Sequence, residues 1–522
     1  MGKIKPLNLI FTFWILAVLT NRCSKTPALA WPEVPTPAYW PTNGWQRTTP
    51  EQLGMDSEKL VEMFAAIQEQ GLNLHSLLIV RNGYRVLEVH YHPYGPGDVH
   101  AVASNTKTVV STLVGIAIDQ GKIESVDQKM LVFFPEREVE QLDPRKEAVS
   151  LRNLLSMTPG LDCEDLTPAA QGMYNASDWV QYLLDLPMNA DPGKQWVYCS
   201  GSAHLLSAIV QAATGVDART YANHYLFQPL GIPEVTQAGW APDAVGVTNG
   251  IAGLFLTPRD LAKLGFLYLH QGQWDGTQVV SRDWMAAATR EQAYIGPDSY
   301  VGGLDRRFGY MFSIFPEQNM YGYLGMAGQE LFVVPEQNLV VVFTGALEVG
   351  TEASLLALVN EYIVPAVQSQ GALPANPAAQ GELEAVAQAA AGETRPVPVL
   401  PQVGQDISGL TYKLNENSTG WQEIGFLFEP GSDEAILRMS NSPDLLIGLD
   451  NRYRLTESPA SRPVGLRGRW QADGKFFMEY ILFGDFIHSQ AWFEFDGDRM
   501  SLTLKYLNFP GQPMILQGTR LP

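Results

Sequence analysis

A serine and a lysine in one short motif are the side chains of this chain best placed to do chemistry. The segment Ser104-Asn105-Thr106-Lys107 precedes a run in which apolar residues recur at helical spacing until Gly121. We therefore predict that Ser104 caps the N-terminus of a helix, with Lys107 one turn further on the same face. A hydroxyl beside an amine, near the positive end of a helix dipole, can become a nucleophile. The alternative is a serine that only caps the helix, followed by a solvated lysine.

A second polar group, Tyr198-Cys199-Ser200, follows a turn and begins another predicted helix. A phenol near an ammonium group can accept a proton and return it, because the positive charge stabilises the phenolate. Lys107 is the expected source of that charge, and the Ser200 hydroxyl is expected to complete the hydrogen-bond network. The alternative is a buried tyrosine followed by a helix cap.

A third segment is rich in glycine and runs from Tyr323 to Gln329. Gly325 and Gly328 allow the backbone to pass close to another group. A strand beside the nucleophile would aim the Met326 N–H, together with the Ser104 N–H, at a developing oxyanion. The alternative is a glycine-rich bend in a strand.

The elements that must position these motifs predict an α+β fold. We expect a mostly antiparallel sheet, built from both ends of residues 47–370 and flanked by helices, with a helical domain inserted between. Asn82-Gly83 predicts a tight hairpin turn, and a four-residue turn, Pro335–Asn338, predicts a second hairpin. The strands expected are Ser76–Val80, Tyr84–His90, Leu331–Val334 and Leu339–Thr344. The helices expected are Asp56–Gln70, Leu151–Met157, Ala176–Leu186, Ala203–Ala213, Pro258–Gln271 and 352–368.

Composition divides the remainder of the chain. Residues 31–46 contain several prolines and predict an extended leader, and residues 371–403 predict an Ala/Pro-rich linker with a short helix near 382–390. Residues 404–522 alternate in short segments between turn residues, which predicts a small β-rich C-terminal domain. Its strand aromatics are expected to form its core; they are Phe477, Tyr480, Trp492, Phe493 and Phe495.

The charge of the chain excludes one class of partner. The 522 residues carry a formal net charge of −20, and no basic stripe offsets it. Such a surface repels nucleic acid phosphates and anionic membranes, so we expect no nucleic acid partner. The expected partner is a small molecule, and the oligomeric state is open.

The N-terminus predicts export. Lys3 and Lys5 precede an apolar run, Leu7–Leu19, and Ala28-Leu29-Ala30 offers a small-residue cleavage site. We predict that residues 1–30 are a signal peptide. The alternative is an uncleaved anchor, which would be the only membrane contact. The protein is therefore expected in the periplasm, outside the cell, or anchored at the outer face of a membrane.

Two cysteines remain after such cleavage, Cys163 and Cys199. In an oxidising compartment they form either a disulfide beside Tyr198 or two small buried thiols, and the sequence favours neither. No Cys/His spacing is typical of a zinc site, so we expect no metal and no cofactor.

The three motifs, in this order, resemble those of the serine β-lactamase-like hydrolases, which include class C β-lactamases, D-alanyl-D-alanine carboxypeptidases, esterases and amidases. The stretches Leu151–Leu161 and Gly253–Leu261 also fit that superfamily. The resemblance covers residues 47–370 and implies a β-lactamase/transpeptidase-like fold. It also implies that Ser104 is the acylated nucleophile, Lys107 its activator, and Tyr198 the general base that later protonates the leaving group.

The departures from that pattern bear on the substrate. Penicillin-recognising members usually carry Tyr-x-Asn, where this chain has Ser200, and Lys-Thr-Gly or His-Thr-Gly, where it has Tyr323-Leu324-Gly325. Tyr323 and Leu324 cannot supply a cation that grips a substrate carboxylate, so with Gln329 they are expected to line an uncharged pocket. This variant is similar to the subgroup of 6-aminohexanoate-dimer hydrolase and related carboxylesterases.

We therefore expect an exported serine hydrolase that cleaves carboxylic esters or small amides through an acyl-enzyme. One alternative is a β-lactamase or D-alanyl-D-alanine carboxypeptidase, and another is a non-catalytic binding or sensory protein on the same fold. The acidic cluster Asp162, Glu164 and Asp165 is interpreted as a solvated loop in preference to a water-activating carboxylate.

Overall fold

The computed structural model describes residues 32–295, 306–348, 351, 353–390, 392, 394–458, 462–509 and 511–522. The predicted signal peptide lies outside the described residues. No helix in the described part of the chain is long and apolar enough to cross a membrane.

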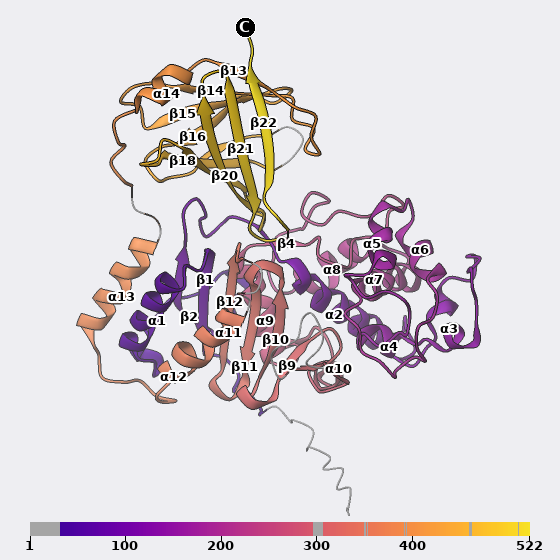
Figure 1. Ribbon diagram of the computed structural model, residues 1–522. Helices are drawn as coiled ribbons and strands as arrows, with labels where there is room; N and C mark the ends of the chain where they lie inside the picture. Colours follow the sequence, from indigo (N-terminus) through magenta and orange to yellow (C-terminus); the bar gives the residue numbers. More distant parts are fainter. Residues whose placement is uncertain are drawn as a thin grey trace, which may run out of the picture.

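An antiparallel sheet of eight strands forms the centre of the N-terminal domain, which we define as residues 32–370 (Figure 1). The strands are β1 Leu74–Arg81, β2 Tyr84–His90, β7 Ala293–Tyr294, β8 Arg307–Phe308, β9 Ser313–Phe315, β10 Met320–Gly325, β11 Gln329–Val334 and β12 Leu339–Gly345. Their order is β2-β1-β12-β11-β10-β9-β8-β7, so the two ends of the domain meet where β1 pairs with β12. The first hairpin turns at Asn82 and Gly83, both at positive φ, as the Asn-Gly pair predicts.

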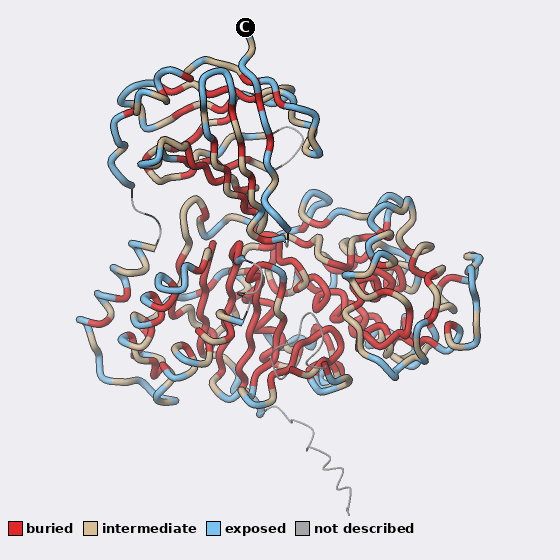
Figure 2. The backbone as a smooth tube through the Cα atoms, in the orientation of Figure 1, coloured by how far each residue is buried: buried red, intermediate tan, exposed pale blue. Residues whose placement is uncertain are grey.

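Each face of the sheet is covered by a separate apolar core, because side chains alternate along the strands. On β1, Leu78 and Val80 join the core shared with the inserted helices, whereas Leu77 and Ile79 join the core on the opposite face. Figure 2 shows the central strands as almost entirely buried.

Short elements complete the domain: β3 His100–Ala101, β4 Phe255–Leu256, β5 Gln273–Trp274, β6 Thr277–Gln278, η1 Pro41–Asn43, η2 Glu51–Leu53, η3 Ala103–Asn105, η4 Met130–Phe133, η5 Met173–Asn175, η6 Asn223–Phe227, η7 Pro316–Gln318, η8 Met326–Gly328, η9 Pro335–Gln337 and η10 Val359–Ile363.

The helices of the N-terminal domain lie on both faces of the sheet and in the insertion between its halves (Figure 1). They are α1 Ser57–Glu69, α2 Thr106–Asp119, α3 Pro144–Ala148, α4 Leu151–Leu155, α5 Pro168–Gly172, α6 Trp179–Asp185, α7 Ser200–Thr214, α8 Ala218–Ala222, α9 Pro258–Leu269, α10 Arg282–Ala288, α11 Ala353–Leu358 and α12 Val364–Ala366. Helix α2 is buried from Thr106 to Ala117, which explains its lack of a polar face. Its Gly115 is needed because a Cβ there would lie 2.5 Å from the Trp284 ring.

The predicted elements match most of these within a few residues, and the differences have physical causes. The linker contains a longer helix than predicted, α13 Pro377–Ala390. Leu383 of that helix is buried against the core that includes α1, so the Ala-rich composition reflects helix packing. The predicted leader is held against the rest of the N-terminal domain, because Trp45 is buried and its indole N–H donates to the Arg259 carbonyl at 3.0 Å.

The C-terminal domain is a closed β-barrel. Its elements are α14 Gln402–Ile407, β13 Thr411–Leu414, β14 Glu423–Phe428, β15 Glu434–Met439, β16 Leu445–Gly448, β17 Arg454–Thr456, β18 Val464–Trp470, β19 Phe476–Leu482, β20 His488–Asp496, β21 Arg499–Tyr506 and β22 Met514–Arg520. Parallel pairing of β16 with β18 closes the ring, and β17 lies beside β18. Phe493 is in the barrel core with Tyr480 and Phe495 packed against it, whereas Phe477 and Trp492 pair on the alternate face.

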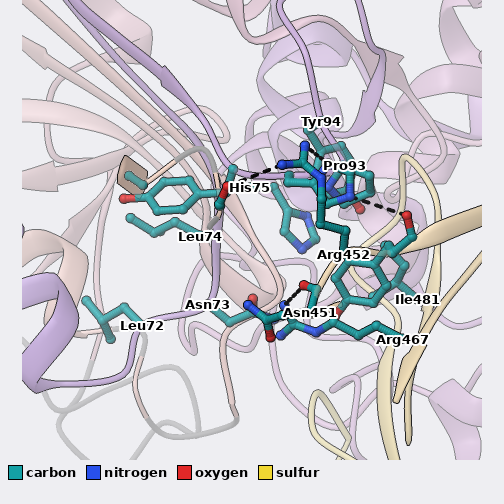
Figure 3. A pocket seen from close by; sticks show the side chains of 15 residues that line it. Leu72, Asn73, Leu74, His75, Pro93, Tyr94, Asn451, Arg452, Arg467 and Ile481 are labelled. Atoms are coloured by element: carbon teal, nitrogen blue, oxygen red, sulfur yellow. Dashed lines mark hydrogen bonds between the residues drawn. The ribbon is translucent and has the colours of Figure 1, made fainter. Parts of the chain in front are cut away.

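The barrel packs against the end of the central sheet and the chain that leads to Ser104 (Figure 1). The Ala101 N–H donates to the Gly484 carbonyl at 2.8 Å, and the ring of Phe483 stacks on Tyr94 at 4.9 Å. Tyr94 also stacks on His75 in the wall of a cavity between the two domains (Figure 3), and Nδ1 of His75 lies 2.7 Å from Nε2 of His100. Burial lowers the pKa of both imidazoles, that of His100 to about 4, so both are neutral at pH 7.

The buried His100 predicts a loss of stability in acid. Its pKa is 6.5 in the unfolded chain and about 4 in the folded protein. Between these two pKa values only the unfolded chain takes up the proton, so the free energy of unfolding falls as the pH drops. The contribution of His100 to that loss is about 3 kcal/mol at pH 4. We expect urea unfolding of His100→Asn to depend less steeply on pH between 7 and 4 than that of the unmodified protein. The control is the exposed His224→Asn, and equal pH dependence of all three proteins would contradict the assignment.

Candidate active site

The three side chains singled out from the sequence meet at one point. Ser104 Oγ lies 2.9 Å from Lys107 Nζ and 3.0 Å from the Tyr198 hydroxyl. Ser104 is in the short turn η3, Lys107 is in the first turn of α2, and Tyr198 precedes α7. Residues distant in sequence are therefore within hydrogen-bonding reach of a single hydroxyl, as nucleophilic catalysis requires.

The turn that presents Ser104 is strained and firmly held. Ala103, just before Ser104, has a φ of 45°, a conformation unfavourable for residues other than glycine. The Asn105 amide is fully buried and donates to the Gln329 carbonyl at 2.7 Å, which ties the turn to the start of β11. Ser104 thus lies one residue before the helix cap, and its hydroxyl faces Lys107 and Tyr198 instead of capping α2.

Lys107 is fully buried, so the alternative of a solvated lysine is wrong. Besides Ser104, its Nζ has the Ile251 carbonyl oxygen at 2.8 Å and the centroid of the Tyr198 ring at 5.2 Å. A buried amine is unfavourable unless it is hydrogen-bonded, and these contacts satisfy it while directing it at the serine.

Tyr198 is linked to the central sheet through a second phenol. Its hydroxyl lies 3.0 Å from the hydroxyl of Tyr323, which is buried on β10. The two phenols and the serine therefore form a continuous hydrogen-bonded row, so a proton accepted at Tyr198 lies within a connected network.

Ser200 has a different partner from the expected one. Its hydroxyl donates to Asp165 Oδ2 at 2.5 Å and its N–H donates to Oδ1 at 2.7 Å. Burial raises the pKa of the Asp165 carboxyl, and the charge of Lys107 and the two bonds from Ser200 offset part of that rise. Asp165 is thus part of the site's electrostatics and not a solvated loop residue.

A disulfide between Cys163 and Cys199 holds this arrangement together. Both cysteines are buried, and the Asp165 N–H donates to the Tyr198 carbonyl at 3.0 Å. The loop that carries Asp165 is therefore fixed to the segment that carries Tyr198. The sequence left pairing and free thiols open, and the structure pairs them.

The end of β10 lies against the turn of Ser104. A Cβ on Gly325 would lie 2.6 Å from the Gln329 carbonyl oxygen and 3.3 Å from the Asn105 amide, so only glycine permits this approach. Met326 follows at once with an exposed side chain, and Ala327 and Gly328 turn the chain at positive φ. The backbone of Met326 is thus next to the nucleophile's turn, where an oxyanion donor would be needed.

Two of the expected pocket residues face elsewhere. Leu324 packs on the opposite face of the sheet, because it alternates with Tyr323 along β10. Gln329 is fully buried, and its amide donates to the carbonyls of Ala327 and Gly345. Leu324 and Gln329 therefore brace the strand, and Tyr323 alone of the three reaches the site.

Sequence reasoning missed the roles of Asp165, Asn105 and the Ile251 carbonyl. A signal for Asp165 existed, since pairing Cys163 with Cys199 would have brought that carboxylate next to Ser200. The other two contacts depend on long-range packing that leaves no local pattern.

Within the described ranges, no group of three or more His, Cys, Asp or Glu side chains is arranged to hold a metal ion.

The chain is also similar in sequence and fold to known proteins. A family model described as Beta-lactamase matches residues 60–356. The chain is 26% identical over 290 residues to 6-aminohexanoate-dimer hydrolase of Paenarthrobacter ureafaciens, covering 51% of this chain and 70% of that relative. It is 28% identical over 153 residues to monacolin J acid methylbutanoyltransferase of Aspergillus terreus, covering 26% of this chain and only 37% of that relative.

A solved structure shares the fold. EstCE1, a hydrolase with promiscuous acyltransferase activity, superposes with a TM-score of 0.50 at 17% identity, covering 60% of this chain and 99% of that one. At this identity the likeness bears on the fold of the N-terminal domain alone.

The disulfide beside Tyr198 makes a prediction about stability. It closes a loop with a sequence separation of 36 residues, for which loop-closure entropy gives about 4 kcal/mol. We expect the double variant Cys163→Ser plus Cys199→Ser to lose stability of that order in urea unfolding. Dithiothreitol should weaken the unmodified protein in the same way and leave the double variant unchanged. An unaltered unfolding midpoint in the double variant would show that the bond does not hold the loop.

Proposed function

From the premise that this chain belongs to the Beta-lactamase family and is a serine hydrolase of the esterase and amidase type, we propose that it cleaves carboxylic esters or small amides through an acyl-enzyme on Ser104. The observation that carries the proposal is the placement of Lys107 Nζ and the Tyr198 hydroxyl at 2.9 Å and 3.0 Å from Ser104 Oγ. A serine hydroxyl needs an adjacent base, and this one has two candidates within reach.

In the proposed acylation step, Ser104 Oγ attacks the substrate carbonyl carbon while its proton passes to Tyr198, whose deprotonated form the Lys107 ammonium stabilises. The carbonyl oxygen becomes an oxyanion that accepts bonds from the N–H groups of Ser104 and Met326. Collapse of the tetrahedral intermediate breaks the bond to the leaving alcohol or amine. Tyr198 returns the proton to that leaving group, and the acyl group stays on Ser104.

Deacylation follows the same proton route in reverse. Water attacks the acyl carbon and gives a proton to Tyr198, which then protonates Ser104 Oγ as the carboxylic acid leaves. In this proposal Asp165 takes no proton; it orients Ser200 and, through the Cys163–Cys199 bond, the Tyr198 segment.

The proposed substrate class follows from Tyr323. This residue occupies the strand position where penicillin-recognising relatives carry a cation, and its hydroxyl is engaged with Tyr198. A phenol offers a substrate carboxylate no charge, and Leu324 beside it points away from the site. Neutral esters and amides are therefore favoured over β-lactams and cell-wall peptides with a free carboxylate.

We also propose that the protein is exported, with residues 1–30 as its signal. The pairing of Cys163 with Cys199 supports this, because structural disulfides persist mainly in oxidising compartments.

Covalent labelling tests the nucleophile. We expect a fluorophosphonate to add one adduct per chain, on Ser104, and p-nitrophenyl butyrate to be hydrolysed. Ser104→Ala should take no adduct and lose at least about a thousandfold in kcat/KM, since the nucleophile of an acyl-enzyme has no substitute. The exposed Ser177→Ala is the matched control and should behave like the unmodified protein.

The same assay separates the alternatives. Nitrocefin should be turned over more slowly than the ester. Faster nitrocefin turnover would favour a β-lactamase, and an unlabelled, inactive native protein would favour a binding role.

A further inference from the structure

A histidine and an aspartate form a buried hydrogen-bonded pair behind the proposed active site. His204 lies on α7, one turn after Ser200, and its side chain and that of Asp243 are both fully enclosed. Nε2 of His204 lies 3.2 Å from Oδ2 of Asp243. The proposed mechanism uses neither residue, although α7 begins just after Tyr198.

Asp243 shapes the loop of residues 240–254, which we call the lysine loop. Its Oδ1 accepts from the N–H groups of Val245 at 3.1 Å and Val247 at 2.8 Å, and its own N–H donates to the Val247 carbonyl at 2.8 Å. Burial raises the pKa of the Asp243 carboxyl, but the bonds from His204 and from these N–H groups lower it by more, so the pKa lies below its ordinary value. The carboxylate is therefore ionised at pH 7 and holds the turn at the tip of the loop.

The lysine loop supplies the carbonyl that holds the amine of Lys107. Lys107 Nζ donates to the Ile251 carbonyl at 2.8 Å, and the Ile251 N–H donates to Asn249 Oδ1 at 2.8 Å. The Asn249 N–H in turn donates to the Ala241 carbonyl at 3.0 Å, which joins this arm of the loop to the arm that carries Asp243. A shift of Asp243 would therefore move the carbonyl that holds the ammonium group.

The lysine loop lies directly against α7. A Cβ on Gly250 would lie 2.3 Å from the Ala203 carbonyl oxygen and 3.1 Å from the His204 Cα, so only glycine permits this approach. One turn further along the helix, the Ser207 hydroxyl donates to the Thr248 carbonyl at 2.7 Å. The loop is thus docked on one flank of the helix, and the His204 bond adds a charge-assisted contact at its turn.

The imidazole of His204 makes its polar contact through Nε2. Its Nδ1 has no hydrogen-bond partner among the residues that the structure describes, and its ring meets Trp179 edge-on, with the ring centroids 5.2 Å apart. Another aromatic ring at this position would keep the packing against Trp179 and remove the bond to Asp243.

We propose that His204 is a positioning residue for the proposed acylation, because its bond to Asp243 fixes the lysine loop against α7. The carbonyl that this loop presents directs the Lys107 ammonium at Ser104, and α7 begins just after Tyr198. The bond thus sets the two groups that activate the serine relative to each other. This role rests on the proposed function, whereas the link between the helix and the loop can be tested without turnover.

Three variants test the role by the rate at which a fluorophosphonate labels Ser104. In His204→Phe the rate should fall roughly ten- to a hundredfold, since a displacement of about 1 Å at a catalytic group can cost that much. His204→Gln offers an amide N–H in place of the Nε2–H and should recover most of the rate. The matched control is His270→Phe, which changes a buried histidine packed against Phe266 and should label like the unmodified protein.

A double-mutant cycle with Lys107→Met separates positioning from a general loss of structure. In that background the Ile251 carbonyl has no ammonium to direct, so adding His204→Phe should change the residual labelling rate little. Additive losses would show that His204 acts independently of Lys107 and would overturn the proposal. Unchanged labelling of His204→Phe, or an equal loss in His204→Gln, would overturn it as well.

Hydrogen exchange on the full-length protein tests the link itself. In His204→Phe the amides of residues 243–251 should exchange faster, whereas those of α2 and β10 should not, and unchanged exchange in the loop would contradict the link. An unlabelled native protein would overturn both the proposed function and the positioning role. A labelled native protein with an unaffected His204→Phe variant would overturn the role alone.

A second variant keeps the test decisive if His204→Phe melts below the unmodified protein. Adding Asp243→Asn removes the unpaired buried charge, and the asparagine Oδ1 can still accept from the N–H groups of the turn. This double variant should label as slowly as His204→Phe, because it also lacks the bond between a histidine and a carboxylate. Labelling at the unmodified rate in the folded double variant would refute the positioning role.

Discussion

A buried amine is the constraint on which the rest of this structure depends. Lys107 is fully enclosed, and its Nζ is hydrogen-bonded to the Ser104 hydroxyl and the Ile251 carbonyl and lies over the Tyr198 ring. An unpaired charge in such a place would be strongly destabilising, so the chain around it must supply partners at fixed distances. In the proposed mechanism the same partners activate the serine, so stability and the proposed chemistry place the same demand on the fold.

Each layer of the molecule contributes to that fixed geometry. The sheet brings β10 against the Ser104 turn through Gly325, and Asn105 ties that turn to β11. The Cys163–Cys199 bond holds the Asp165 loop against the Tyr198 segment. From the other side, the Gly484 carbonyl of the barrel accepts from the Ala101 N–H, so the chain around Ser104 is held on both sides by elements distant in sequence.

Local patterns in the sequence predict the helices, the strands and the three residues Ser104, Lys107 and Tyr198. They can do so because hydrophobic periodicity, Asn-Gly turns and motif spacing are local properties. Helix α13 was underestimated because its Ala-rich sequence has little apolar periodicity until Leu383 meets α1. Leu324 and Gln329 were misplaced because strand alternation and burial depend on the register of the sheet. Asp165 was misjudged because its partners, Ser200 and Lys107, approach only once the disulfide and the insertion are formed. The closure of the barrel likewise depends on a β16–β18 pairing with no local signature.

The most direct test of this account is the acylation rate of Lys107→Met, measured by stopped flow with p-nitrophenyl butyrate. Methionine fills the space of the lysine stem without its charge, so the melting temperature should be kept or raised. The acylation rate should fall by about 10²–10⁴-fold, the range typical of a lost acid–base group. An unchanged acylation rate in a folded Lys107→Met protein would contradict the claim that this buried amine activates Ser104.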